Sequence, residues 1–333
     1  MNITTLGLVL EKFSIKNKFI KKLKFILKKS INNFIIVSLT GGLGDQINQY
    51  IFGRILSDKL SCNLIFDTSY YKQKKIPFKI QITKFKINSL AKFENELFRL
   101  PFRIIQYNRF WPRFIFNNLI GNFLFKKKIK FFFYDYWHYT FLRNNYKFKK
   151  NSYYFGYWHS LPFFKEKFLK IKKEFILKKE SKDFKNVKNR ITKSCVAIHI
   201  RGGDFLNNIH AIILNNNYYS KGINYFIKKI KKPIFYIFTN DKVHSEILLK
   251  NIKKNIKIKY ISSFNLQDVE EFEIMRHFKN LIIANSTFSW TASYMSHNPD
   301  VKIIAPKIWD NKYKKYDPKF ELDKKNKNMI ILK

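Results

Sequence analysis

The chain has 333 residues, of which 46% are hydrophobic and 18% aromatic, so it can bury the cores of about two domains and is not a disordered chain. Its 65 Lys and Arg against 23 Asp and Glu give a formal net charge of +42, which predicts attraction to phosphates and anionic membranes. The abundance of Lys, Asn, Ile, Phe and Tyr is also what an AT-rich genome produces. Cys62 and Cys195 belong to no CxxC or Cys/His cluster, so we expect a reducing compartment and no zinc site.

Residues 1–32 form a predicted basic extension. In "SIKNKFIKKLKFILKKS", five apolar residues recur at spacings of three and four, and lysines fill most other positions. This pattern is typical of an amphipathic helix that lies on an anionic membrane surface. The alternative is an ordinary helix whose apolar stripe packs on the domain. No run of 18 apolar residues exists, so no membrane span is expected.

A first Rossmann-like domain is predicted over residues 33–175. Phe34–Leu39 is a short apolar strand, "TGGLG" forms a tight turn, and helical spacing continues to about residue 60, before a second strand in "CNLIFD". The glycines match neither GxGxxG nor a GxxxxGK[ST] loop. Near the end of this domain, "LPFFKEKFLKIKKEFILKKE" predicts one continuous helix.

Strands and helices alternate in a second domain, predicted over residues 190–333. Its strand "VAIHI" contains His199 near its end and is followed by Arg201 and Asp204. The strand "PIFYIFT" is followed by Asp241. Ligands of open α/β sheets bind at the carboxyl ends of the strands. A guanidinium binds phosphate through parallel hydrogen bonds, so Arg201 indicates a phosphate site. The alternative is a surface ion pair between Arg201 and Asp204.

"NSTFSW" lies between a further strand and a helix. Hydroxyls and free backbone N–H groups at a helix N-terminus bind anions, which favours a ligand near Ser286 and Thr287. The alternative is that one of these residues only caps the helix. No Asp-x-Asp pair is present to hold a divalent ion, so no metal site is predicted.

Four blocks in this order resemble the bacterial α-1,2-fucosyltransferases of glycosyltransferase family 11. They are "GGLGDQINQYIFGRIL", "YYFGYWHS", "VAIHIRGGDF" and "NLIIANSTFSWTASYMS", and the resemblance runs from about residue 35 to about residue 310. The third and fourth blocks together are the specific ones. The basic extension lies outside the resemblance.

The resemblance implies a GT-B-like α/β fold in which two Rossmann-like domains face each other across a cleft. Such enzymes transfer L-fucose from GDP-fucose to the 2-hydroxyl of a galactoside, invert the anomeric configuration, and require neither a metal nor another cofactor. The C-terminal domain binds the donor and the N-terminal domain reads the acceptor. Carried onto this chain, the donor-binding residues are His199, Arg201, Asp241, Asn285, Ser286, Thr287 and Phe288. Arg201 would stabilise the GDP leaving group.

Two positions depart from the family pattern. Gly202 stands where the signature has a second arginine, which puts one phosphate contact in question. Asp45 stands where the family has an asparagine, and we hypothesise that Asp45 or Asp204 is the general base of the transfer. Glu270 and Glu271 are further candidates for that role.

The expected protein is a cytoplasmic glycosyltransferase, peripheral on the inner face of the membrane through residues 1–30. Its expected acceptor is a galactose-terminated oligosaccharide or lipid-linked glycan, such as an O-antigen of lipopolysaccharide. Three alternatives remain: the same fold with a different acceptor or linkage, a transferase-like domain that only binds because of Gly202, and a basic protein that binds nucleic acid or an anionic surface. For the third alternative, the chain has aromatic residues among its lysines but no nucleic-acid-binding motif, so no nucleic-acid partner is expected.

Overall fold

The fold is described from a computed structural model of the chain. It describes residues 33–72, 76–88, 91–94, 130–133, 148–159, 168–206, 211–250, 252, 256–309 and 328–332. The predicted basic extension at residues 1–32 lies outside these residues. The chain divides into two compact units, which are treated separately.

The first unit contains residues up to Thr40, Gln49–Ile80 and Asn88–Trp158. Its five parallel strands lie in the order β3-β2-β1-β5-β4. Their bounds are β1 Phe34–Ser38, β2 Asn63–Asp67, β3 Ala91–Glu94, β4 Lys130–Phe133 and β5 Ser152–Phe155. Helix α3 (Leu43–Leu60) connects β1 to β2. Its residues from Gln49 onward belong to this unit, and its beginning belongs to the other.

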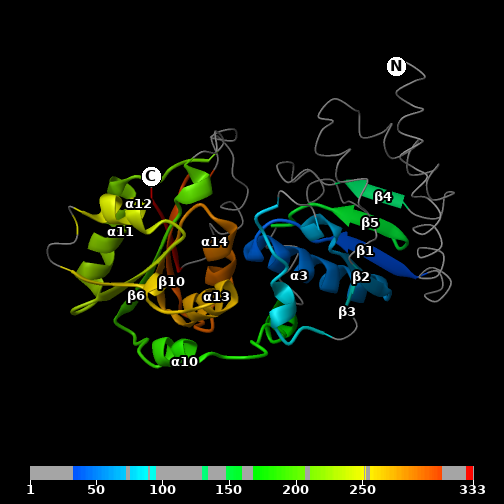
Figure 1. Cartoon of the computed structure of the whole chain (residues 1–333), viewed down its shortest axis with the longest axis horizontal. Helices are drawn as coiled ribbons and strands as arrows, with labels where there is room; N and C mark the ends of the chain where they lie inside the picture. Colours follow the sequence, from blue (N-terminus) through cyan, green and yellow to red (C-terminus); the bar gives the residue numbers. More distant parts are fainter. Residues whose placement is uncertain are drawn as a thin grey trace, which may run out of the picture. The chain divides into compact units, whose positions relative to one another are not determined.

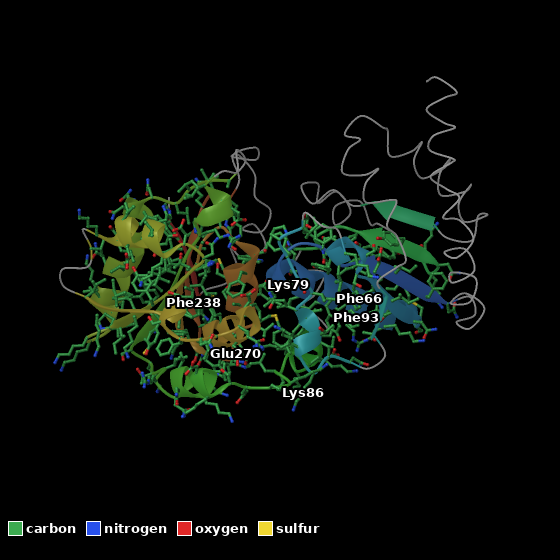
Figure 2. All side chains as sticks on the ribbon, in the orientation of Figure 1. Phe66, Lys79, Lys86, Phe93, Phe238 and Glu270 are labelled. Atoms are coloured by element: carbon green, nitrogen blue, oxygen red, sulfur yellow. The ribbon has the colours of Figure 1, made fainter. Side chains whose placement is uncertain are left out.

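The central strand of this sheet is buried on both faces, as expected for a parallel sheet covered by other elements. On one face Tyr50 of α3 stacks on Phe66, with ring centroids 5.4 Å apart. Phe66 in turn stacks on Phe93 at 5.2 Å, and Figure 2 shows these two rings side by side. Phe52 stacks on Trp158 at 3.8 Å. Aromatic stacking between α3 and the strands is therefore part of the core of this unit.

The second unit contains residues Gly41–Asn48, Gln81–Ile87 and His159 onward. Its six parallel strands lie in the order β11-β10-β9-β6-β7-β8. Their bounds are β6 Cys195–Ile200, β7 Ile234–Thr239, β8 Lys257–Tyr260, β9 Asn280–Ile282, β10 Lys302–Pro306 and β11 Met329–Leu332. The helices are α9 Phe168–Lys172, α10 Lys182–Lys188, α11 Asn216–Lys229, α12 Lys242–Leu249, α13 Asp268–His277 and α14 Thr287–Tyr294.

Helices cover both faces of the second sheet. Helices α11 and α12 lie on one side of it, and α13 and α14 lie on the other (Figure 1). Alternate residues Val196, Ile198 and Ile200 of β6 pack against α11. On the opposite face Phe238, labelled in Figure 2, meets Phe278 after α13 with ring centroids 5.8 Å apart. The prediction of an α/β chain with two Rossmann-like sheets is confirmed.

The division into units differs from the domain bounds predicted from the sequence. Residues 159–175 were predicted to belong to the first domain, yet they group with the second unit, as do Gly41–Asn48 and Gln81–Ile87. Gln46 explains part of this grouping. Its Oε1 accepts hydrogen bonds from the backbone N–H groups of Gln81 and Ile82, at 2.9 and 3.1 Å.

The continuous helix predicted over residues 161–180 is wrong for its described part. Helix α9 ends at Lys172, and Leu177 forms an antiparallel bridge with Phe85. Backbone pairing with residues 84–86 therefore takes this stretch out of the helical conformation. Ile176 in this stretch is 52% exposed. Among the described residues, no helix is both long enough and apolar enough to cross a membrane.

Candidate active site

The strand order of the second sheet is enough to indicate where a ligand would bind. Read from β6 in chain order, the strands follow the arrangement 3-2-1-4-5-6, which reverses direction between β6 and β9. Ligands of such sheets bind outside the carboxyl ends of the strands at this reversal. The segments that follow β6 and β9 there are those that begin at Arg201 and at Ile283. The two most specific sequence blocks therefore meet at the same edge.

Arg201 follows β6 and is partly exposed. Its Nη2 lies 2.7 Å from Oδ1 and 2.9 Å from Oδ2 of Asp204, so the ion pair considered from the sequence is present. The guanidinium carbon lies 5.3 Å from the centroid of the Phe205 ring. Within the described part of the chain, the Nε of Arg201 is buried and has no hydrogen-bond partner. Asp204 thus orients the guanidinium through Nη2, and the contact leaves the Nε–H without a hydrogen-bond partner.

Residues after β7 hold the Arg201 loop in place. The backbone N–H of Gly202 donates to Oδ1 of Asn240 at 3.0 Å, and that of Gly203 donates to Oδ2 of Asp241 at 3.1 Å. The other carboxylate oxygen of Asp241 caps α12 by accepting from the His244 N–H at 3.0 Å. These backbone donors lower the pKa of Asp241 below its usual value. Both carboxylate oxygens of Asp241, which was predicted to bind the donor, therefore already accept hydrogen bonds from the surrounding backbone.

A glycine at position 202 is required for a steric reason that the sequence did not reveal. A Cβ atom at this position would lie 2.7 Å from Cβ of Asp241 and 3.1 Å from Cδ2 of His244. Any side chain here has to displace the residues that hold the loop. An arginine at position 202 is therefore incompatible with this arrangement of Asp241 and His244.

His199 connects β6 to α14. Its Nδ1 lies 2.8 Å from Oγ of Ser289, and its ring centroid lies 5.7 Å from that of Phe288. Burial and, to a smaller extent, the charge of Arg201 lower the pKa of His199 to about 3. The imidazole is therefore neutral at physiological pH. It positions the start of α14 and adds no charge to the site.

Helix α14 presents its N-terminus to this edge of the sheet. Ser286 occupies the N-cap position, but its side chain makes no capping hydrogen bond. The first N–H groups of a helix have no partner within the helix, and together with the helix dipole they attract anions. The side chain of Asn285 has a structural role, because its Nδ2 donates to the backbone oxygens of Ile212 and Trp309 at 2.8 and 3.1 Å. These hydrogen bonds connect the loops that contain Ile212 and Trp309 to the turn before α14.

The first turn of α3 lies against the start of α14. A Cβ on Gly44 would lie 2.5 Å from the carbonyl carbon of Thr287 and 2.7 Å from the nitrogen of Phe288. Four residues later, Asn48 donates to Oγ1 of Thr291 at 2.8 Å and accepts from the Tyr294 hydroxyl at 2.5 Å. Gly41–Asn48 belongs to the second unit, so these contacts lie within one compact body. The structure thereby joins the first and fourth sequence blocks.

The carboxylates proposed as general base have different surroundings. Oδ1 of Asp45 lies 3.0 Å from Nε2 of the buried His159, so its charge has a partner. Glu270, labelled in Figure 2, accepts from the backbone N–H groups of Ser181 and Gln267 and completes a capping box. Burial and the nearby Asp268 raise the pKa of Glu271 to about 7. Both oxygens of Glu270 are therefore engaged in structural contacts, whereas Asp45, Asp204 and Glu271 remain candidates.

Several residues of this edge were not predicted as site residues. Asn240, His244 and Ser289 hold the loops, and His159 pairs with Asp45. Asn240 and Ser289 had a usable signal, since both lie in polar stretches at strand or helix ends. His159 had none beyond its place after an aromatic cluster. Among the described residues at this edge, no three potential metal ligands lie close together.

Comparison with known proteins gives the family. The model of glycosyl transferase family 11 matches residues 35–330. The α-1,2-colitosyltransferase of Escherichia coli is 27% identical over 292 residues, which cover 83% of this chain and 92% of that protein. The O-antigen biosynthesis glycosyltransferase WbnK of Escherichia coli is 27% identical over 296 residues, covering 81% and 93%. Among solved structures, the fucosyltransferase NodZ from Bradyrhizobium is 10% identical with a TM-score of 0.46, covering 78% of this chain and 92% of that one. The chain belongs to glycosyltransferase family 11 and is a glycosyltransferase.

Proposed function

We propose that this glycosyltransferase moves L-fucose from GDP-fucose to the 2-hydroxyl of a galactoside, with inversion and without a metal. The observation that carries the proposal is the meeting of Arg201 and the N-terminus of α14 at the point where the strand order reverses. A guanidinium and a helix N-terminus are both suited to a diphosphate. The names of the two relatives support the linkage and the class of acceptor, because one is an α-1,2-colitosyltransferase and the other an O-antigen biosynthesis glycosyltransferase.

Departure of GDP places the developing negative charge on its β-phosphate. In the proposed reaction Arg201 stabilises this charge, and Asp204 holds the guanidinium in position. The backbone N–H groups at Thr287 and Phe288 supply the remaining donors. Removing one preorganised donor of this kind typically costs about 10²- to 10³-fold in kcat.

The general base in this proposal is Asp45, assisted by His159. The carboxylate lies in the turn that contacts the start of α14, close to where the sugar attached to the diphosphate would be. The acceptor hydroxyl gives its proton to Asp45 as it attacks the anomeric carbon from the face opposite to GDP. Asp204 is less suitable for this role because both of its oxygens bind Arg201.

We place the acceptor in a cell-surface glycan, such as an O-antigen repeat that ends in galactose. The name of the second relative supports this class of acceptor. The net charge of +42 suits an enzyme that meets a lipid-linked glycan at an anionic inner leaflet. Cytoplasmic location, with residues 1–30 on the membrane, is part of the same proposal.

The test is a transfer assay with purified protein, GDP-fucose and lactose in the presence of EDTA, with the product linkage determined by NMR. A fucosyl group on the galactose 2-hydroxyl is the expected product. A parallel reaction with GDP-colitose tests the donor, because a relative is named for colitose. If product forms with GDP-colitose and not with GDP-fucose, the donor sugar is colitose and this part of the proposal is wrong. Dependence on added metal would refute the proposed mechanism.

Arg201→Ala and Asp45→Asn test the residue roles, with GDP affinity measured by calorimetry. Loss of Arg201 should weaken GDP binding about 10- to 100-fold, since a hydrogen bond to a charged group contributes about 1.5–3 kcal/mol. Arg190→Ala is the matched control, because Arg190 is exposed and precedes β6 at the opposite edge of the sheet. Asp45→Asn should keep GDP affinity and lose turnover. Unchanged turnover in Asp45→Asn together with a loss in Glu271→Gln would move the base to Glu271.

A further inference from the structure

A cluster of metal-ligand side chains lies at the other edge of the second sheet. Glu273 and His277 are four residues apart on α13, and His297 follows α14. Their ligand atoms all lie within 4.8 Å of one another. The proposed transfer reaction has no use for these residues.

The position of this cluster separates it from the candidate active site. His277 ends α13 three residues before β9 begins, and His297 lies five residues before β10 begins. Both are therefore at the amino ends of parallel strands, whereas Arg201 and Ser286 follow carboxyl ends. Strands of three to six residues at about 3.3 Å per residue put roughly 10–20 Å between the two edges.

The three donors converge on one point. Oε1 of Glu273 lies 2.6 Å from Nε2 of His297 and 3.4 Å from Nε2 of His277. The two imidazole rings stack with centroids 4.5 Å apart and their planes 28° apart. The Nε2 of His277 is buried and makes no hydrogen bond within the described residues. A buried ring nitrogen directed at a carboxylate oxygen without bonding it is the feature that indicates a missing ligand.

The surroundings of Glu273 resemble the support of a metal ligand. Its other oxygen, Oε2, accepts from Nη1 of the fully buried Arg276 at 2.5 Å. Arg276 is itself fixed, because it donates to the backbone oxygens of Phe175 and Met295 at 2.8 and 2.9 Å. Carboxylates that bind metals are commonly held by such hydrogen bonds to their second oxygen. Oε1 is thus oriented toward the two histidines.

We propose that Glu273, His277 and His297 bind a divalent metal ion of the zinc class. Two imidazoles and one carboxylate are ligands that Zn²⁺ prefers, whereas Mg²⁺ and Ca²⁺ prefer sites made of oxygen alone. Tetrahedral coordination at 2.0–2.2 Å places donors about 3.4 Å apart, so the ion would replace the bond between Glu273 and His297. His297 has room to move, since its side chain is 37% exposed. The ion would fasten the end of α13 to the loop after α14.

The test is calorimetric titration of the full chain, carrying no histidine tag and freed of metal by dialysis, with ZnCl₂ and separately with MgCl₂. One Zn²⁺ per chain and no Mg²⁺ binding is the expected result. His277→Ala and His297→Ala should each weaken Zn²⁺ binding at least about 10-fold. His244→Ala is the matched control, because it removes a histidine of the same unit at the opposite edge.

A second measurement keeps the proposal testable if a variant is poorly folded. Zn²⁺ should raise the thermal unfolding midpoint of the wild-type chain and leave that of His297→Ala unchanged. No saturable Zn²⁺ binding by the wild type, or equal binding by wild type and both alanine variants, would overturn the proposal and leave a hydrogen-bonded Glu–His pair. Metal binding is read directly, so the result does not depend on which sugar the enzyme transfers.

Discussion

Gly44→Ala tests whether the first turn of α3 and the start of α14 form one binding edge. The added Cβ would lie 2.5 Å from the carbonyl carbon of Thr287 and 2.6 Å from its oxygen. Non-bonded carbon atoms settle at about 3.5 Å or more, so the backbone of α14 has to move by roughly 1 Å. Overpacking of this kind costs about 1–3 kcal/mol.

The displacement falls on the N–H groups proposed to bind the diphosphate. We therefore expect GDP affinity to fall about 10- to 100-fold, which corresponds to about 1.4–2.8 kcal/mol. Calorimetric titration with GDP measures this loss, and circular dichroism with urea denaturation reports the accompanying change in stability.

Gly53→Ala is the control in the same helix. Its Cβ would lie 3.0 Å from Cδ1 of Leu64 and from Cζ of Phe66, which are ends of side chains in the first unit. Alanine favours a helix over glycine by at most about 1 kcal/mol at either position. Gly53→Ala should change stability slightly and leave GDP affinity unchanged. Wild-type GDP affinity in Gly44→Ala would refute the reasoning that the two turns form one site.

Three further predictions follow from individual contacts. Gly202→Arg, which introduces the arginine of the family signature, should weaken GDP binding by calorimetry because its Cβ would collide with Asp241; tighter binding would contradict this. Ser289→Ala should destabilise the fold by about 1–3 kcal/mol in urea denaturation, because the buried His199 loses its hydrogen-bond partner. Burial raises the pKa of Asp67 from its ordinary value near 3.8 to about 6 in the folded chain, so the unfolded chain releases this proton first as the pH rises. The wild type should therefore lose about 2 kcal/mol relative to Asp67→Asn between pH 4 and pH 6, and parallel stability curves of the two proteins would contradict this.

Much of the arrangement at the carboxyl edge of the second sheet could be predicted from the sequence, because its signals are local. Apolar runs that end in His199, Arg201 and Asp241 identify strands and the edge to which their ends belong. In a parallel sheet all such ends meet at one edge, so the residues come together whatever the details of packing. The family blocks added the chemistry, and the family model that covers residues 35–330 confirms them.

Other features depended on partners far away in the sequence. The stretch after Lys172 has helical spacing, yet pairing with Phe85 and the hydrogen bond from Arg276 to the carbonyl of Phe175 give it another conformation. The cluster of Glu273, His277 and His297 was not predicted for the same reason. His297 comes from a separate element, so it is not near the other two residues in the sequence.

The sequence by itself determined the α/β class, the family and the edge at which the donor is proposed to bind. These depend on periodicity and on short motifs, which are properties of neighbouring residues. Only the tertiary structure decided that Gly202 leaves space for Asp241, that Gly44 lies against Thr287, and that Glu270 caps a helix. Steric contact and hydrogen-bond partners are properties of residues distant along the chain. They exist only once the backbone has brought those residues together.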